Sequence, residues 1–135
     1  VFLSDYAHHP KEIRQNNASL REVFGGRRLT AIFQPHLFTR TRDFYKDFAK
    51  SLSQLDEVIL TDIYPAREKP LPGVTSQIIY DELRPDMERV LCKVTDVPTI
   101  IEQGDYDVLI VLGAGDVDNH CAQITQILKK KYAIG

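Results

Sequence analysis

The sequence feature that most constrains the fold is a regular alternation of short apolar runs with longer segments of helical periodicity. The most apolar run, Asp107–Leu112 (DVLIVL), has the length of a strand and almost no polar residue. This pattern is typical of a strand buried on both faces at the centre of a parallel sheet. Shorter or less apolar strand-like runs lie at Val1–Ser4, Leu29–Phe33, Glu57–Thr61 and Val90–Val94.

The segments between these runs carry apolar residues at helical spacing, as Phe44 and Phe48 do. Pro10 suits a first helical turn, Gly25–Gly26 suits a helix end, and Thr41 is the predicted N-cap of the next helix. Because strands separated by helices favour parallel pairing, the sequence predicts a doubly wound, mostly parallel, Rossmann-like α/β sheet with helices on both faces. A length of 135 residues fits a single domain over residues 1–135.

The charge balance and the hydropathy argue against several function classes. Lys and Arg number 17 and Asp and Glu 19, so the net charge of −2 argues against a dedicated nucleic-acid binder. No apolar run approaches the ~18 residues of a membrane span, and no leader precedes the first strand. Cys92 and Cys121 lie in apolar segments, which favours buried thiols in a cytoplasmic protein. The chain opens on Val1 within a strand pattern, so we expect a piece of a larger protein.

Polar residues gather directly after the first predicted strand. In open parallel sheets ligands bind beyond the carboxyl ends of the strands, so this position is where a site is expected. Asp5 and Tyr6 offer a carboxylate and an aromatic ring that can stack on a base, and His8 and His9 can donate hydrogen bonds or move a proton. Solvated histidines in a loop before a helix are the alternative interpretation.

A second cluster follows the predicted strand Leu29–Phe33. His36 and Thr39 precede Arg40, which we expect just before a helix N-terminus with free N–H groups. A guanidinium, hydroxyl groups and a helix dipole together favour an anion site for a carboxylate or a phosphate. The alternative is that Arg40 forms a structural ion pair with Asp43.

Other chemistries have weaker support in the sequence. His8, His9, His36 and Asp5 could surround a metal ion, but their spacing matches no metal-binding pattern, and the metal prediction is none. The two glycines of Gly113–Asp116 would let a ligand approach, yet a tight turn explains them equally well. No GxxxxGK[ST] sequence occurs, so we expect a partner domain to hold nucleotide phosphates.

The motifs DYAHHP (Asp5–Pro10), FQPHLFTRT (Phe33–Thr41), DIYPAREKPLPG (Asp62–Gly73) and GAGD (Gly113–Asp116) together resemble the C-terminal domain of the Mur ligases. The resemblance covers essentially the whole chain. It implies a three-domain, ATP-dependent ligase of peptidoglycan precursor synthesis that joins L-alanine to UDP-N-acetylmuramate through an acyl phosphate. The sugar domain and the central domain, which would hold ATP and Mg²⁺, are absent from this chain, and the isolated domain is expected to be inactive.

The resemblance also implies roles for individual residues. Tyr6, with Asp5 beside it, is expected on the adenine side of ATP, and His8 and His9 on the catalytic side. His36, Arg40 and Thr39 are expected to face L-alanine. Many relatives have Arg where this chain has Leu37, so Arg40 would carry more of the carboxylate recognition. Two alternatives stay open: a related murein-peptide ligase domain, and a nonenzymatic α/β module that binds a nucleotide or an anion.

Overall fold

The described strands form one parallel sheet in the order β1-β5-β2-β3-β4. The computed structural model describes residues 2–5, 10–112 and 121–131, and for residues 2–5, 121 and 131 only the backbone. The strands are β1 (Phe2–Asp5), β2 (Leu29–Phe33), β3 (Glu57–Leu60), β4 (Glu88–Leu91) and β5 (Val108–Leu112). The helical elements are α1 (Pro10–Phe24), α2 (Phe38–Leu52), α3 (Gln77–Glu82), the 3₁₀ turn η1 (Val94–Asp96), α4 (Val97–Gln103) and α6 (Cys121–Lys131).

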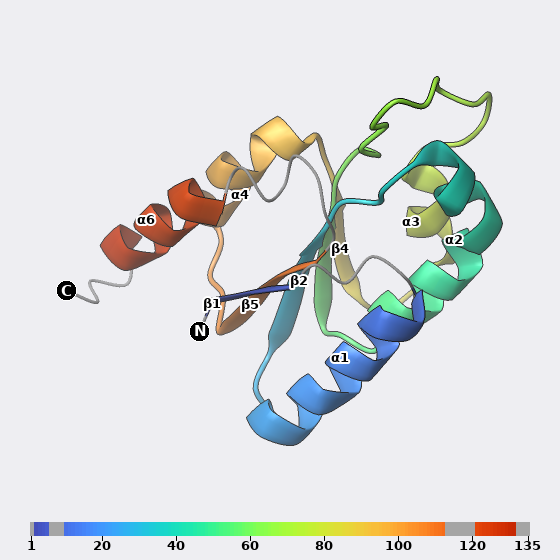
Figure 1. Cartoon of the computed structure of the whole chain (residues 1–135). Coiled ribbons are helices and arrows are strands. Elements are labelled where there is room, and N and C mark those ends of the chain that lie inside the picture. Colours follow the sequence, from blue (N-terminus) through green and yellow to red (C-terminus); the bar gives the residue numbers. More distant parts are fainter. Residues whose placement is uncertain (1, 6–9, 113–120, 132–135) are drawn as a thin grey trace.

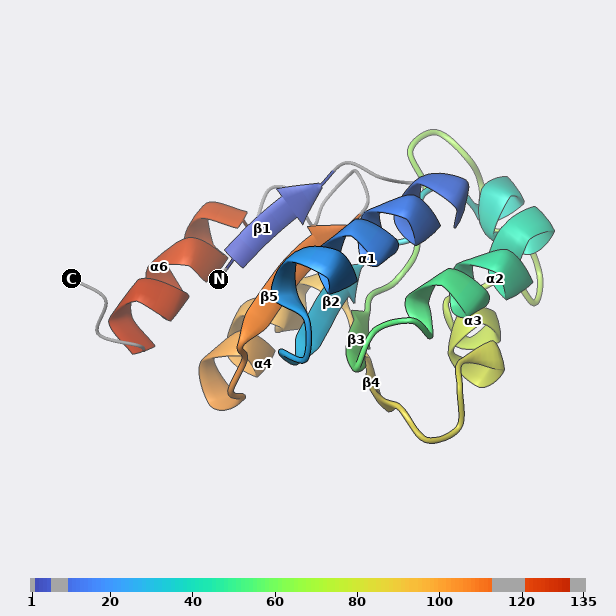
Figure 2. The same cartoon turned by 90° about the horizontal axis from the view of Figure 1, so that it is seen from below.

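Helices cover both faces of the sheet, as Figures 1 and 2 show. On one face α1, α2 and α3 pack through a buried cluster that includes Ile13, Phe48 and Ile79. On the other face α4 and α6 pack through a second cluster that includes Ile101 and Ile124. Burying each large apolar side chain contributes about 1.5–3 kcal/mol, so two apolar faces suffice to hold the layers together. The prediction of a doubly wound α/β fold is confirmed.

The start of α2 differs from the prediction. The helix begins at Phe38, and Thr41 lies buried in its first turn rather than at its N-cap. The Thr41 hydroxyl donates to the carbonyl oxygen of Leu37 at 2.8 Å, so it bonds backwards along the helix. Leu37 occupies the N-cap position with φ 71° and has no capping side chain. Arg40 therefore lies inside the first helical turn and not before the helix.

β5 marks the position where the direction of the connections changes. It lies between β1 and β2, which lead into α1 and α2 on one face, whereas α6, which follows β5, packs on the other face. The register aligns Asp5 with Leu112, Leu112 with Phe33, and Phe33 with Leu60. The carboxyl ends of these strands are therefore level, and connections diverge from them toward opposite faces, which is where such folds bind ligands.

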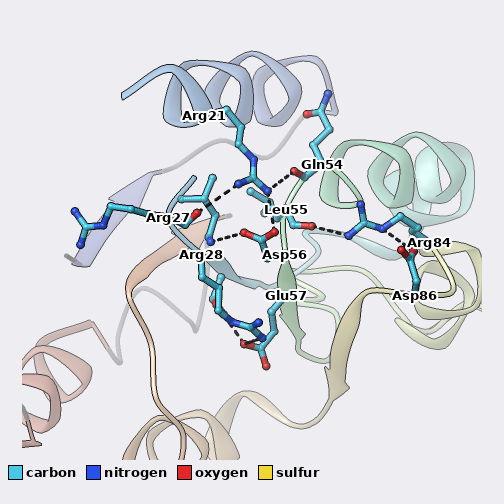
Figure 3. A network of polar contacts seen from close by, with 11 residues as sticks. Arg21, Arg27, Arg28, Gln54, Leu55, Asp56, Glu57, Arg84 and Asp86 are labelled. Carbon is cyan, nitrogen blue, oxygen red and sulfur yellow. Dashed lines mark hydrogen bonds and ion pairs between the residues drawn. The ribbon is translucent and has the colours of Figure 1, made fainter. Parts of the chain in front are cut away.

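The opposite edge of the sheet carries a network of polar contacts that joins strand starts to α1 (Figure 3). Asp56 accepts a hydrogen bond from the Leu29 N–H at 2.7 Å and pairs with Arg21 at 3.1 Å. Arg21 also donates to the carbonyl oxygen of Gln54 at 3.1 Å. Burial opposes ionisation of Asp56, but the Leu29 N–H and Arg21 outweigh it, so the pKa of Asp56 lies below its ordinary value.

Further ion pairs extend this network along the same edge. Arg28 contacts Glu57 at 3.2 Å and Glu88 at 2.5 Å, which links the starts of β2, β3 and β4. Arg27 binds the Asp107 carboxylate and so joins the chain before β2 to the chain before β5. Most of these side chains are exposed to solvent, which weakens such ion pairs, so they contribute little to the stability of the fold.

Asp56→Ala is expected to lower the free energy of unfolding of the chain by about 1–2 kcal/mol at neutral pH, because it removes a charged acceptor from a backbone N–H and from Arg21. The folded-state pKa of Asp56 is lowered, so its contribution is complete above its ordinary value of 3.8 and is lost as the pH falls through the folded-state value. Urea denaturation should therefore find that the difference in the free energy of unfolding between variant and wild type shrinks as the pH falls below 3.8. Asp86→Ala, which removes an exposed partner of Arg84, is the matched control and should have little effect at either pH.

Cys92 follows β4 directly and is half-buried, not enclosed in a strand as expected. Burial first, and then the charges of Asp96 and Asp62, raise the pKa of its thiol to about 11. The thiol is therefore protonated and unreactive at neutral pH. The side chain of Cys121 lies outside the described residues.

Candidate functional site

The structure brings the predicted residues His36, Thr39 and Arg40 together at the carboxyl edge of β2. His36 lies in the short connection between β2 and α2, and the other two lie in the first turn of α2. A guanidinium nitrogen of Arg40 lies 3.4 Å from Nδ1 of His36. All three side chains are half-buried. The site is therefore open to a ligand from outside the domain while its polar groups are held by the fold.

The contact between Arg40 and His36 brings a guanidinium, which can only donate, to a ring nitrogen of the imidazole. The alternative partner of Arg40 is not used, because Asp43 pairs instead with Arg42 at 2.9 Å. Among the contacts described here, Arg40 therefore lies beside an imidazole rather than a carboxylate, which favours its use in binding an anionic group.

Tyr64 also contacts this cluster, and the sequence did not predict that contact. The Tyr64 N–H donates to the carbonyl oxygen of Pro35, and the Leu37 N–H donates to that of Tyr64, both at 2.8 Å. These bonds form an isolated parallel bridge beyond the ends of β2 and β3. The Tyr64 ring stacks on His36 with centroids 5.6 Å apart and planes 19° apart. The stacking fixes one face of the imidazole.

Glu68 is the second residue that the sequence did not single out. Its carboxylate accepts from the Thr39 N–H at 3.1 Å and from the Thr39 hydroxyl at 2.6 Å. The Thr39 hydroxyl contributes most to lowering the pKa of Glu68; burial opposes it, and the N–H groups of Thr39 and Phe38 and the charge of Arg42 add to it. The helix N-terminus that was expected to have free N–H groups is thus occupied by a carboxylate of the same chain.

Two residues next to the site have a left-handed backbone. Leu37 has φ 71° and Ala66 has φ 53°. A side chain at positive φ costs about 1–2 kcal/mol, and such conformations gather at functional sites. Ala66 lies in the turn closed by the bond from the Glu68 N–H to the Pro65 carbonyl oxygen, so its conformation directs Glu68 back toward α2.

Ala66→Gly is expected to raise the free energy of unfolding by about 0.5–1 kcal/mol, because glycine adopts positive φ without the steric cost and Ala66 is exposed. Ala66→Val should lower it by about 1 kcal/mol, since a β-branched residue fits this region worst. Urea denaturation of both variants measures the effect. Equal stability of the two variants would contradict the described turn.

Several predicted site residues lie outside the described residues. These are Tyr6, His8 and His9, the segment 113–116, and the side chain of Asp5, whose backbone ends β1. Their roles stay predictions. The metal alternative is likewise untested for these residues; in the part of the chain that the structure describes, no group of three His, Cys, Asp or Glu could hold a metal ion. None of the described helices is both long and apolar enough to cross a membrane.

Two hollows of the described surface lie away from the cluster. A groove of about 330 Å³ between α1 and α2 is lined by Pro10, Lys11, Arg14, Phe44, Asp47, Lys50 and Ser51. A second hollow of about 580 Å³ lies between α4 and α6. Neither includes His36, Thr39 or Arg40. These two hollows are therefore separate from the cluster.

The fold and the cluster define a class: a doubly wound α/β domain with an arginine–histidine pair at its ligand edge. Residues 1–115 match the family model described as "Mur ligase, glutamate ligase domain". The chain belongs to this family.

Individual relatives agree with the family match. The UDP-N-acetylmuramate–L-alanine ligase of Phocaeicola vulgatus is 62% identical over 131 residues, which are 97% of this chain and 29% of that protein. The chain thus spans less than a third of the length of the relative. The crystal structure of the UDP-N-acetylmuramate–alanine ligase of Thermotoga maritima is similar with a TM-score of 0.70 and 26% identity, over 99% of this chain and 27% of that chain.

A third relative shares the fold. It is the crystal structure of a domain from a putative UDP-N-acetylmuramate:L-alanyl-γ-D-glutamyl-meso-diaminopimelate ligase of Haemophilus ducreyi. The TM-score is 0.64 at 21% identity, over 93% of this chain and 89% of that chain. A domain of this fold therefore crystallises without the rest of its protein.

Proposed function

We propose that this chain is the C-terminal domain of a UDP-N-acetylmuramate–L-alanine ligase, which forms an amide bond at the expense of ATP in peptidoglycan precursor synthesis. The observation that carries the proposal is the 62% identity to the Phocaeicola vulgatus ligase over 97% of the chain. The proposed partners are UDP-N-acetylmuramate, L-alanine and the protein's own sugar-binding and central domains. The proposed location is the cytoplasm, where ATP and nucleotide sugars are available.

In the proposed reaction, the γ-phosphoryl group of ATP is transferred to the carboxylate of the UDP-sugar, and ADP leaves. The amine of L-alanine then attacks the carbonyl carbon of the acyl phosphate, loses a proton and displaces phosphate. We assign the carboxylate of L-alanine to Arg40, with His36 beside it. The half-buried Arg40–His36 pair at the carboxyl edge of β2 supports this role, because a partner domain that closes over it would orient the amine and exclude water from a hydrolysable acyl phosphate.

The remaining roles are proposed from the sequence motifs. His8 and His9 are candidates for the catalytic side, and Tyr6 with Asp5 for the adenine side of ATP. Mg²⁺ and the ATP phosphates are assigned to the central domain. This assignment is supported by the absence of a phosphate-loop sequence from the chain.

The function is tested by phosphate release from the full-length protein that carries this domain. The assay supplies ATP, Mg²⁺ and UDP-N-acetylmuramate, and compares a panel of amino acids and peptides as acceptors. Release that depends on L-alanine supports the proposal, and the 135-residue chain alone should release none. Release that depends on a peptide would reassign the domain to a murein-peptide ligase. No release with any acceptor would favour a nonenzymatic binding module.

Tyr6→Ala in the full-length protein is expected to raise the KM for ATP by about 5- to 150-fold, because stacking on a base is worth ~1–3 kcal/mol. The KM for L-alanine should stay nearly constant. Tyr6→Phe keeps the ring and is the matched control, with a KM for ATP close to that of wild type. Steady-state kinetics with each substrate varied in turn gives both constants. An unchanged KM for ATP in Tyr6→Ala would remove the residue from the adenine side.

A further inference from the structure

The N-terminus of α2 has no cap of its own. The residue at its N-cap position, Leu37, has an apolar side chain and a positive φ, and no side chain of the helix start bonds back to the first turn. The first N–H groups of a helix have no partner within the helix and carry a partial positive charge. Such a terminus attracts a carboxylate, and at this edge two carboxylates compete for it: one from the chain and one from the proposed amino-acid substrate.

Glu68 satisfies this terminus from a distant part of the chain. Both of its carboxylate oxygens are used, one on the Thr39 N–H at 3.1 Å and one on the Thr39 hydroxyl at 2.6 Å. The Phe38 N–H also favours the charged form of Glu68. These contacts take up donors that were predicted to bind a substrate anion, whereas the guanidinium of Arg40 lies 3.4 Å from Nδ1 of His36.

The segment that contains Glu68 also contacts the site through Tyr64. Four backbone positions before Glu68, Tyr64 bonds to Pro35 and Leu37 and stacks on His36. The turn closed by Glu68 N–H and the Pro65 carbonyl oxygen joins the two points. Residues 64–68 therefore contact both the residues before α2 and its first turn, and the imidazole that faces Arg40 lies between these contacts (Figure 1 shows this loop beside the start of α2).

We propose that Glu68 is a positioning residue for the amino-acid site. By occupying the N-terminus of α2, it directs the substrate carboxylate to Arg40 rather than to the helix N–H groups. By anchoring residues 64–68, it holds the Tyr64 ring on His36 and so fixes the pair of His36 and Arg40. This inference rests on the proposed function. It assigns to the DIYPAREKPLPG segment the positioning of the pair of His36 and Arg40.

The first test uses Glu68→Ala in the full-length protein. The KM for L-alanine is expected to rise about 10-fold, as for the loss of a charge-assisted hydrogen bond, whereas kcat and the KM for ATP change less than about twofold. Glu68→Gln keeps an acceptor oxygen and should recover part of the loss. Added acetate should lower the raised KM of Glu68→Ala, because a free carboxylate can occupy the vacated helix terminus. Glu82→Ala, an exposed substitution on α3, is the control and should change none of these values.

A structural role alone would not give this pattern. A general loosening of the domain would alter kcat and both KM values together and would not respond to acetate, and that result would overturn the proposal. So would a Glu68→Ala protein whose KM for L-alanine equals that of wild type. The rescue by acetate is therefore the decisive measurement.

A second measurement keeps the inference separate from the proposed function. In the 135-residue chain, the amide resonance of Thr39 should follow an acidic titration that disappears in Glu68→Ala and persists in Glu82→Ala. The Tyr64 and His36 ring resonances should shift in Glu68→Ala alone. If the full-length protein shows no ligase activity but these changes occur, the proposed function fails while the positioning by Glu68 stands. Unchanged Thr39 and His36 resonances in Glu68→Ala would overturn the proposed role of Glu68, whether or not the full-length protein is a ligase.

Discussion

Arg40→Ala in the full-length protein is expected to raise the KM for L-alanine by about 10- to 100-fold, because a guanidinium–carboxylate contact is worth ~1.5–3 kcal/mol. The KM for ATP should change by less than about threefold. The physical reason lies in the local charges: Glu68 occupies the helix N-terminus, so the substrate carboxylate is directed to the guanidinium of Arg40 rather than to the helix N–H groups. Steady-state kinetics with L-alanine and ATP varied separately measures both constants.

The same helix offers a matched control. Arg42 lies one position beyond Thr41, is exposed and pairs with Asp43, so Arg42→Ala removes an equal charge without removing the contact between Arg40 and His36. It should leave both KM values near those of wild type. Arg40→Lys keeps the charge but loses the planar two-pronged geometry, and should fall between wild type and Arg40→Ala. Equal effects of Arg40→Ala on both substrates, or none, would remove Arg40 from the amino-acid site.

Phe48→Ala is expected to lower the free energy of unfolding of the chain by about 3–5 kcal/mol, as is typical for the loss of a buried aromatic ring. Phe48 is fully buried on α2, and its ring lies 5.3 Å from that of Phe33 at the end of β2. The substitution leaves a cavity directly beneath the connection that carries His36. Since a domain of this kind has only about 5–15 kcal/mol of net stability, the variant should approach the limit of folding.

Urea denaturation followed by circular dichroism measures the loss. Phe44→Ala, one turn earlier on the same helix, removes a half-buried ring and should cost clearly less. A loss below about 1 kcal/mol for Phe48→Ala would contradict the packing of α2 on the sheet.

Local sequence signals were sufficient for the elements whose boundaries depend on local chemistry. β2 has the predicted bounds, and α1 begins at Pro10, since a proline in the first turn and a glycine pair after the helix act through the adjacent backbone. The level strand ends follow from parallel pairing, so the location of the candidate site could also be predicted.

The start of α2 could not be predicted, because its cap comes from Glu68, which is 29 positions away from Thr39 in the sequence. Thr41 had the right chemistry for a cap but bonds backwards along the helix instead. The partner of Asp43 was equally ambiguous, because Arg40 and Arg42 are both within helical reach, and the fold selects Arg42. The stacking of Tyr64 on His36 depends on the isolated parallel bridge between these two residues, which lies beyond the ends of β2 and β3.

The place of β5 in the sheet has a consequence for synthesis on the ribosome. β1 pairs with β5, and β2 pairs with β3 and β5. Among the strands that the structure describes, β1 therefore has no neighbour until Val108–Leu112 has been translated. Contacts between positions so far apart form late and slow folding. Nascent chains arrested before this strand should remain sensitive to protease over their N-terminal segment, and the domain should acquire resistance in one step once it is released.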